Sequence, residues 1–120
     1  MKQNGMPELH QLTPTLTILQ KRGFKVALVT DGRMSGASGK VPAAIHLTPE
    51  ASEGGPIAKV KSGDILKLDA INGTLICLTQ DFELREPVTK IVKTQGFGRE
   101  LFSNLRTAIS SSEEGASFIL

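Results

Sequence analysis

The sequence is poor in aromatic side chains and in cysteine. Its 120 residues include five Phe, no Trp, no Tyr and a single cysteine, Cys77. Stacking platforms for bases and sugars need aromatic faces, so any ligand is expected to be held mainly by polar groups. One thiol can neither form a disulfide within the chain nor supply the several ligands of an iron–sulfur cluster. We expect Cys77, which lies in the apolar run 74–78, to be a strand residue packed in or near the core.

A strong charge of one sign and long apolar runs are missing as well. With 14 Lys and Arg against 12 Asp and Glu the net charge is +2 without a basic block, which argues against nucleic-acid binding. No run approaches the roughly 18 apolar residues of a membrane span. We therefore expect a cytoplasmic protein with no membrane partner. One domain over residues 1–120 is expected, with residues 1–4 as a linker or added start and residues 110–120 as a mobile tail.

Helix start and stop signals predict the helical segments. Thr13, followed by proline, is typical of an N-cap, and Gly23 should end that helix. A single helical turn should follow Pro49 and stop at Gly54. Apolar residues at helical spacing predict another helix after Gly98.

Short runs rich in apolar and β-branched residues predict strands between these helices. They cover residues 24–29, 43–47, 57–60, 64–71 and 74–79. Asn72-Gly73 favours a two-residue hairpin turn between the last two strands. Many short strands with few helices indicate an α+β domain, a small barrel-like mixed sheet with flanking helices, rather than a doubly wound nucleotide fold.

The loop after the first predicted strand has the composition of a ligand site. It reads Thr30-Asp31-Gly32-Arg33-Met34-Ser35-Gly36-Ala37-Ser38-Gly39-Lys40. Backbone amides and hydroxyls in such a loop can converge on an anion. The same composition also suits a solvated turn, so the loop alone leaves both interpretations open.

Three segments together resemble the carboxy-terminal domain of the dihydroxy-acid dehydratase and phosphogluconate dehydratase family. They are Gly5-Met6-Pro7-Glu8, residues 29–36, and residues 46–58, which begin His46-Leu47-Thr48-Pro49-Glu50-Ala51. Their order and spacing are similar to the family's over residues 5–80. The continuation Leu9-His10 and the form of the loop through Lys40 look most like the members that act on 6-phosphogluconate.

The resemblance implies a swivelling β/β/α domain at the carboxyl end of a larger hydro-lyase. Complete members carry an amino-terminal domain that supplies the cluster cysteines and most magnesium ligands, and they are expected to be homodimers. The implied reaction is dehydration of 6-phospho-D-gluconate to 2-keto-3-deoxy-6-phosphogluconate in the Entner–Doudoroff pathway. The full-length enzyme is expected to need a 4Fe–4S cluster and Mg²⁺. The isolated domain is expected to hold neither and to be inactive.

The resemblance also implies roles for individual residues. Ser35 matches the family's proposed base, and Glu8 matches a magnesium ligand. A serine hydroxyl is a poor base unless a metal, a cation or aligned amides stabilise its alkoxide. Mg²⁺ accepts hard carboxylate oxygens, which suits glutamate. The loop's composition adds candidate contacts to the substrate carboxylate or phosphate, from Arg33, Gly36, Ser38, Gly39 and Lys40.

The sequence is also compatible with other interpretations. Arg33 could instead form an ion pair with Asp31, and His46 suits a structural, hydrogen-bonded histidine. Glu50 and Glu53 look like cap and turn residues. The substrate could be a 2,3-dihydroxy-3-methyl acid of branched-chain biosynthesis or an unphosphorylated sugar acid. The chain could also be a non-catalytic anion-binding module.

Overall fold

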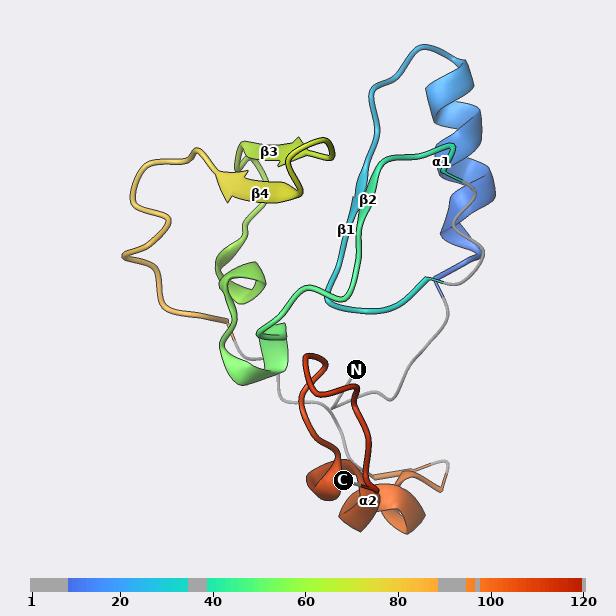
Figure 1. The fold of residues 1–120 in the computed structure, drawn as a ribbon, viewed down its shortest axis with the longest axis vertical. Coiled ribbons are helices and arrows are strands. Elements are labelled where there is room, and N and C mark those ends of the chain that lie inside the picture. The colour runs from blue at the N-terminus through green and yellow to red at the C-terminus, as the bar shows by residue number, and fades with distance from the viewer. Residues whose placement is uncertain (1–8, 35–38, 89–94, 97, 120) are drawn as a thin grey trace.

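The protein combines helices with small sheets, which confirms the α+β class. The computed structural model describes residues 9–34, 39–88, 95–96 and 98–119. Helix α1 lies beside the β1–β2 pair, the β3–β4 hairpin lies on the other side of that pair, and α2 lies at the far end of the molecule (Figure 1). The elements follow the order α1 (Leu12–Lys21), β1 (Leu28–Val29), β2 (Ala43–Ala44), η1 (Ala51–Glu53), η2 (Pro56–Lys59), β3 (Leu66–Asp69), β4 (Thr74–Cys77), η3 (Arg99–Phe102) and α2 (Ser103–Ala108).

The strands pair in two separate two-stranded sheets, β1 parallel to β2 and β3 antiparallel to β4. Hydrogen bonds extend the parallel ladder beyond the short strands. The Leu28 amide donates to the Pro42 carbonyl (2.9 Å), and the His46 amide donates to the Gly32 carbonyl (3.0 Å). Parallel and antiparallel pairing are therefore both present, but in different sheets, and the strands that the structure describes form neither one mixed sheet nor a closed barrel.

Helix α1 begins at Leu12, slightly before the predicted start. Gln11 is the N-cap, and Thr13 lies inside the helix. The Thr13 hydroxyl contacts the Sδ atom of Met34 at 3.3 Å, which ties the helix to the loop after β1. Gly23 follows the helix with a φ of +92°, a conformation that favours glycine and confirms the predicted stop.

Residues 57–59 are helical, and the strand predicted over residues 57–60 is wrong. Helix η2 covers Pro56–Lys59, and the Ala58 amide donates to the Gly55 carbonyl (2.9 Å). A Cβ on Gly55 would lie 1.7 Å from the carbonyl oxygen of Pro49, so only glycine fits. Pro56 follows Gly55 directly, and its fixed φ suits the first position of a helix. This backbone preference outweighs the strand tendency of the β-branched residues that follow.

The predicted β3–β4 hairpin is confirmed, but its turn is longer than predicted. Asp69 pairs with Thr74, which leaves residues 70–73 as the loop. The Asp69 Oδ1 atom accepts hydrogen bonds from the amides of Ile71 (3.1 Å) and Asn72 (3.0 Å). The aspartate side chain therefore organises this turn, in place of a two-residue type I′ turn at Asn72-Gly73.

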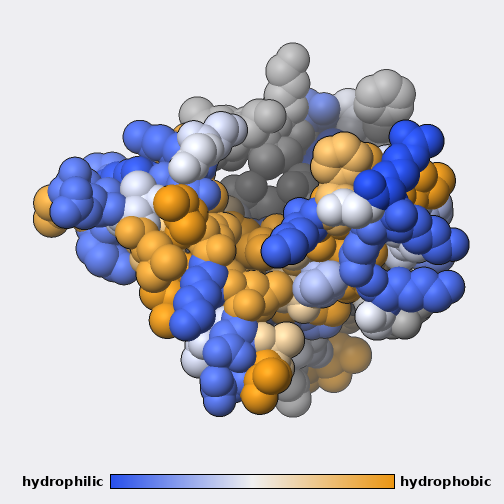
Figure 2. Space-filling view, turned by 90° about the horizontal axis from the view of Figure 1, so that it is seen from above, coloured by the Kyte–Doolittle hydropathy of each residue, from blue (hydrophilic) through white to orange (hydrophobic). Residues whose placement is uncertain are grey.

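The apolar core of the described residues is small. Buried apolar side chains are Met34, Val41, Ala58 and Phe82. Ile71, Leu84 and Ile119 are instead more than four-fifths exposed, at 96%, 82% and 82%. Figure 2 shows apolar side chains along the middle of one face, bordered by hydrophilic ones. Cys77 lies half-buried in β4 and lines a cavity of about 190 Å³ between the sheets, in agreement with its predicted place near the core.

Candidate functional site

The first part of the Gly/Ser loop lies at the carboxyl end of β1. The Gly32 amide donates to the Thr30 hydroxyl (2.9 Å), which closes a tight local turn. Met34 is buried, at 7% exposure. The Leu9 amide donates to the Arg33 carbonyl (3.4 Å). This bond joins Leu9, the residue after the first motif segment, to the loop.

Asp31 joins the loop to the third motif segment. Its Oδ2 atom accepts a hydrogen bond from the Ala51 amide at 2.8 Å. Ala51 is the first residue of η1, and a carboxylate at an exposed helical amide makes a strong, charge-assisted bond. The ladder bond from His46 to Gly32 adds a second link between the same two segments. The second and third motif segments thus meet at the carboxyl end of the parallel ladder, and we call this meeting point, residues 30–33 with residues 46–55, the junction.

Glu50 forms the buried part of the junction. Among the residues that the structure describes, Glu50 is the charged residue that is buried, with 2% of its surface exposed. Its Oε2 atom accepts from the Ser52 hydroxyl (3.4 Å), and its Oε1 atom accepts from the Ser112 hydroxyl. The sequence indicates a cap and turn role, and Glu50 is indeed the N-cap of η1. Its burial and its link to Ser112 have no local sequence signal, because the two residues lie 62 positions apart.

The loop returns to the sheet at the opposite end of the ladder. A connection between parallel strands leaves the carboxyl end of one and enters the amino end of the next. Arg33 therefore follows β1 at one end, and Lys40 precedes β2 at the other. The paired residues 28–32 span about 13 Å at roughly 3.3 Å per residue. Arg33 is half-buried, whereas Gly39 and Lys40 are exposed, and the ladder separates the two cations.

Four of the candidate residues lie outside the described part of the chain. They are Glu8, Ser35, Gly36 and Ser38. The base, metal-ligand and substrate-contact roles assigned to them stay predictions. His46 is described, with an exposed side chain and a φ of 56°, and its backbone amide makes the ladder bond to Gly32.

The described residues do not form a metal centre by themselves. Over residues 9–34, 39–88, 95–96 and 98–119, no three His, Cys, Asp or Glu side chains gather closely enough to hold a metal ion. Cys77 is the single thiol, and it lies in β4 rather than at the junction. The magnesium ion and iron–sulfur cluster implied by the resemblance therefore do not fit these residues alone. Within the same ranges, no helix has the length and apolar character needed to cross a membrane.

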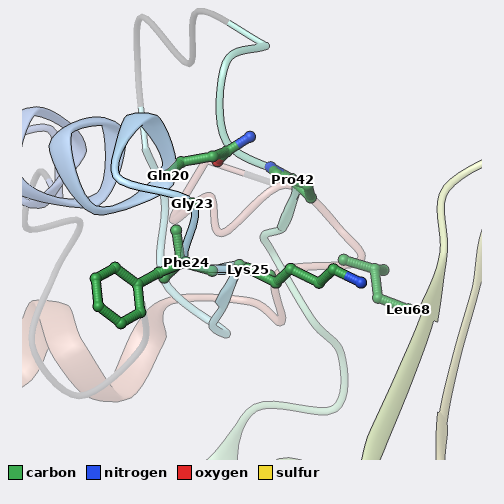
Figure 3. A pocket seen from close by; sticks show the side chains of 8 residues that line it. Gln20, Gly23, Phe24, Lys25, Pro42 and Leu68 are labelled. Atoms are coloured by element: carbon green, nitrogen blue, oxygen red, sulfur yellow. The ribbon is translucent and has the colours of Figure 1, made fainter.

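A cleft of about 530 Å³ lies at the amino end of the ladder, where the loop returns. The Lys25 side chain reaches toward Leu68 of β3, while the Phe24 ring points the opposite way (Figure 3). The lining offers one cation and the amide of Gln20 among apolar groups. This is too little convergent polar chemistry for a catalytic centre, so the junction remains the candidate site.

Comparison with known proteins gives a consistent pattern. A family model described as "Dihydroxy-acid/6-phosphogluconate dehydratase C-terminal" matches residues 1–116. The chain is 60% identical over 117 residues to the phosphogluconate dehydratase of Pseudomonas aeruginosa, covering 94% of the chain and 19% of that protein. It is 55% identical over 122 residues to the Escherichia coli K12 phosphogluconate dehydratase, covering 98% of the chain and 20% of that protein. Identity to the dihydroxy-acid dehydratase of Methanosphaera stadtmanae is 35% over 112 residues, covering 93% of the chain and 20% of that protein. The chain thus spans about a fifth of the length of these relatives.

Proposed function

The chain belongs to the dihydroxy-acid/6-phosphogluconate dehydratase C-terminal family, and from this membership we propose that it serves as the carboxy-terminal part of a 6-phosphogluconate dehydratase. The observation that carries the proposal is the junction, where Ala51 binds Asp31 (2.8 Å) and Leu9 binds Arg33 (3.4 Å). The bond from Leu9 to Arg33 joins described residues close in sequence to Glu8 and Ser35, and the bond from Ala51 to Asp31 adds the third motif segment. The sugar-acid substrate is favoured because the chain is 60% identical to a relative named phosphogluconate dehydratase and 35% identical to one named dihydroxy-acid dehydratase.

The proposed reaction removes water from a 2,3-dihydroxy acid. A base takes the proton from carbon 2, the C–H electron pair forms the carbon 2–carbon 3 double bond, and hydroxide leaves carbon 3. The resulting enol tautomerises to the 2-keto acid. We assign the proton abstraction to Ser35, in the loop that begins at Thr30.

The junction's part in this reaction is to orient the loop. Asp31, near the start of the loop, is held by its hydrogen bond to the Ala51 amide. Met34 is buried in the core and contacts Thr13. A base must lie within hydrogen-bond reach of the proton that it removes, so holding the start of the loop should limit the positions open to Ser35 in the complete enzyme. The Mg²⁺ and the 4Fe–4S cluster are proposed to depend mainly on the part of the longer enzyme outside this chain, with Glu8 as this chain's contribution to the magnesium site. The longer enzyme is proposed to be a homodimer.

A chimaeric enzyme tests the proposal. This chain would replace the matching region of the Pseudomonas aeruginosa relative, and turnover of 6-phosphogluconate would be measured. The chimaera should be active, and Ser35→Ala should lower kcat by about 10²–10⁴-fold, the usual contribution of a general base. Ser62→Ala, an exposed serine before β3, is the matched control and should leave kcat unchanged.

Each result of this assay decides between the candidate functions. Turnover of 2,3-dihydroxyisovalerate but not of 6-phosphogluconate would replace the proposed substrate with that of the sibling enzymes. An inactive chimaera, together with micromolar binding of a small anion to the isolated chain, would favour the non-catalytic anion-binding module. Unchanged kcat in Ser35→Ala would remove the serine from the proposed role.

Lys40 is proposed to contact the phosphate of the substrate, at the end of the loop away from Arg33. Its side chain is exposed next to the returning strand, as a contact to a charged ligand requires. Lys40→Ala in the chimaera should raise KM for 6-phosphogluconate about 10-fold, the effect of one lost charge-assisted bond, with kcat nearly unchanged. An unchanged KM would contradict this contact. Lys67→Ala, an exposed lysine of β3, is the control.

A further inference from the structure

The segment that contains Ser112 folds into a compact hydrogen-bonded turn. The Ser110 amide donates to the Ser117 carbonyl (2.9 Å), and the Ser117 amide donates back to the Ser110 hydroxyl (3.0 Å). Inside it, the Ser111 amide and hydroxyl both donate to Glu114 Oε2 (3.1 Å each). We call residues 110–117 the serine turn. Its mobility, expected from the polar sequence, stays a prediction.

The serine turn contacts the junction through Glu50. The Ser112 hydroxyl donates to Glu50 Oε1, and both side chains are at least half-buried. A hydrogen bond between a hydroxyl and a carboxylate is charge-assisted, and at 2% exposure Glu50 has little water to replace it. Loss of the Ser112 hydroxyl therefore removes a hydrogen bond that helps to fix the Glu50 carboxylate within the junction.

Glu50 is in turn coupled to the loop through its own backbone. Its carbonyl accepts from the Glu53 amide (2.9 Å) and from the Gly55 amide (3.0 Å), which shapes the η1 turn. The next residue, Ala51, donates its amide to Asp31 (2.8 Å), where the loop begins. A continuous series of bonds thus runs from Ser112 through Glu50 and Ala51 to Asp31.

We propose that Glu50 is a positioning residue that couples the serine turn to the loop carrying Ser35. The inference rests on the proposed function, because the consequence to be measured is the placement of the base. Glu50 itself does not touch the substrate in this account. Removal of the Ser112 contact should shift the η1 turn, loosen the bond from Ala51 to Asp31, and misplace the loop.

Kinetics of the chimaera separate positioning from a merely structural role. Ser112→Ala should lower kcat about 10-fold per folded active site, the effect of one lost buried hydrogen bond, with KM within about twofold. Glu50→Ala should lower kcat about 100-fold, and Glu50→Gln, which keeps an acceptor oxygen, should recover most of that loss. The double variant Glu50→Ala/Ser112→Ala should be no slower than Glu50→Ala, because both changes break the same bond.

A matched control lies in the same turn. The Ser111 hydroxyl bonds to Glu114, which also belongs to the serine turn. Ser111→Ala removes this bond and should leave kcat within about twofold. Equal losses in Ser111→Ala and Ser112→Ala would mean that the integrity of the turn matters and not its link to Glu50. Additive effects of the Glu50 and Ser112 changes, or unchanged kcat in Ser112→Ala, would likewise overturn the inference.

A measurement that needs no activity keeps the inference separate from the proposed function. In the chain itself, Ser112→Ala should speed hydrogen exchange of the Ala51 amide about 10-fold, while Ser111→Ala should not. If the unmodified chimaera is inactive but this exchange result holds, the proposed function fails and the coupling stands. If the chimaera is active but Ala51 exchange is unaffected by Ser112→Ala, the coupling fails and the proposed function stands.

Discussion

The junction and the hairpin unit, residues 61–88, each place a carboxylate among hydrogen-bond donors, but the donors differ. In the hairpin unit Asp64 binds the Arg85 guanidinium through two bonds, at 2.6 and 3.0 Å, and also accepts from the Lys61 amide at 2.7 Å. In the junction, the bonds described for Asp31 and Glu50 come from neutral amides and hydroxyls. Asp64 thus has its charge compensated by a cation, whereas Asp31 holds a backbone amide 20 positions away along the chain.

The two regions also differ in the longest sequence separation that their hydrogen bonds bridge. In the hairpin unit the ladder joins neighbouring strands, with Asp69 opposite Thr74, and the Asp64–Arg85 pair spans 21 positions. The junction bonds join residues 20 positions apart at Asp31–Ala51 and 62 positions apart at Glu50–Ser112. A bond across 62 positions, such as Glu50–Ser112, fixes how distant parts of the chain pack, whereas a hairpin ladder fixes only neighbouring strands. We infer that the hairpin unit is scaffold and that the junction carries the functional geometry.

The largest predicted effect on stability is at Gly55 in the junction. In Gly55→Ala the new Cβ would lie 1.7 Å from the Pro49 carbonyl, so the backbone must move. The free energy of unfolding should fall by about 3 kcal/mol or more, as for severe overpacking. Gly73→Ala in the hairpin turn is the control, with a φ of +65° and open space around the site, and should cost about 1–2 kcal/mol. Equal losses measured by urea unfolding would contradict the close packing of the junction.

A smaller loss is predicted for the carboxylate that links the loop to η1. Asp31→Ala leaves the Ala51 amide without its acceptor at 2.8 Å, which should lower the free energy of unfolding by about 1–3 kcal/mol. Asp31→Asn keeps an acceptor oxygen and should lose clearly less. Urea unfolding of both variants checks the order, and an Asp31→Asn as unstable as Asp31→Ala would show that charge, rather than the hydrogen bond, holds this link.

The hairpin unit should contribute a dependence of stability on acid. The hydrogen bonds from Arg85 hold the pKa of Asp64 at about 2, below its usual 3.8. A carboxylate with a lowered pKa stabilises the fold above its unfolded pKa, and that contribution is lost as pH falls from about 4 toward 2. Asp64→Asn and Arg85→Gln should both flatten the fall of the urea midpoint over this range. If the urea midpoint of Asp64→Asn fell with pH as much as that of the unmodified chain, other carboxylates would be responsible for the acid sensitivity.

The sequence predicts local structure better than the junction. Gly23 and Gly54 end helices as predicted, because a positive φ is a local property of glycine. The strand predicted over residues 57–60 is wrong because Pro56 and the contact of Gly55 with Pro49 dominate over residue type. The turn after Asp69 is longer than predicted because a side chain, rather than the Asn-Gly pair, sets it.

The candidate site could be predicted only in outline. The motif segments include Asp31 and Glu50 but do not identify them as the groups that hold the loop. Their bonds to Ala51 and Ser112 depend on how η1 and the serine turn pack, and no residue pattern encodes that packing. Likewise, the composition of the loop suggests one anion cradle, whereas the parallel pairing of β1 and β2 places Arg33 and Lys40 at opposite ends of the ladder.

The contrast between junction and hairpin unit is tested most directly by comparing kcat for Asp31→Ala and Asp64→Asn in the chimaeric enzyme. Misplacing a base by about 1 Å costs roughly 100-fold in rate, so Asp31→Ala should lower kcat for 6-phosphogluconate about 100-fold per folded active site. Asp64→Asn should stay within about twofold, although it removes the carboxylate of the bidentate Arg85 pair. Equal losses in the two variants, or a larger loss in Asp64→Asn, would contradict the account.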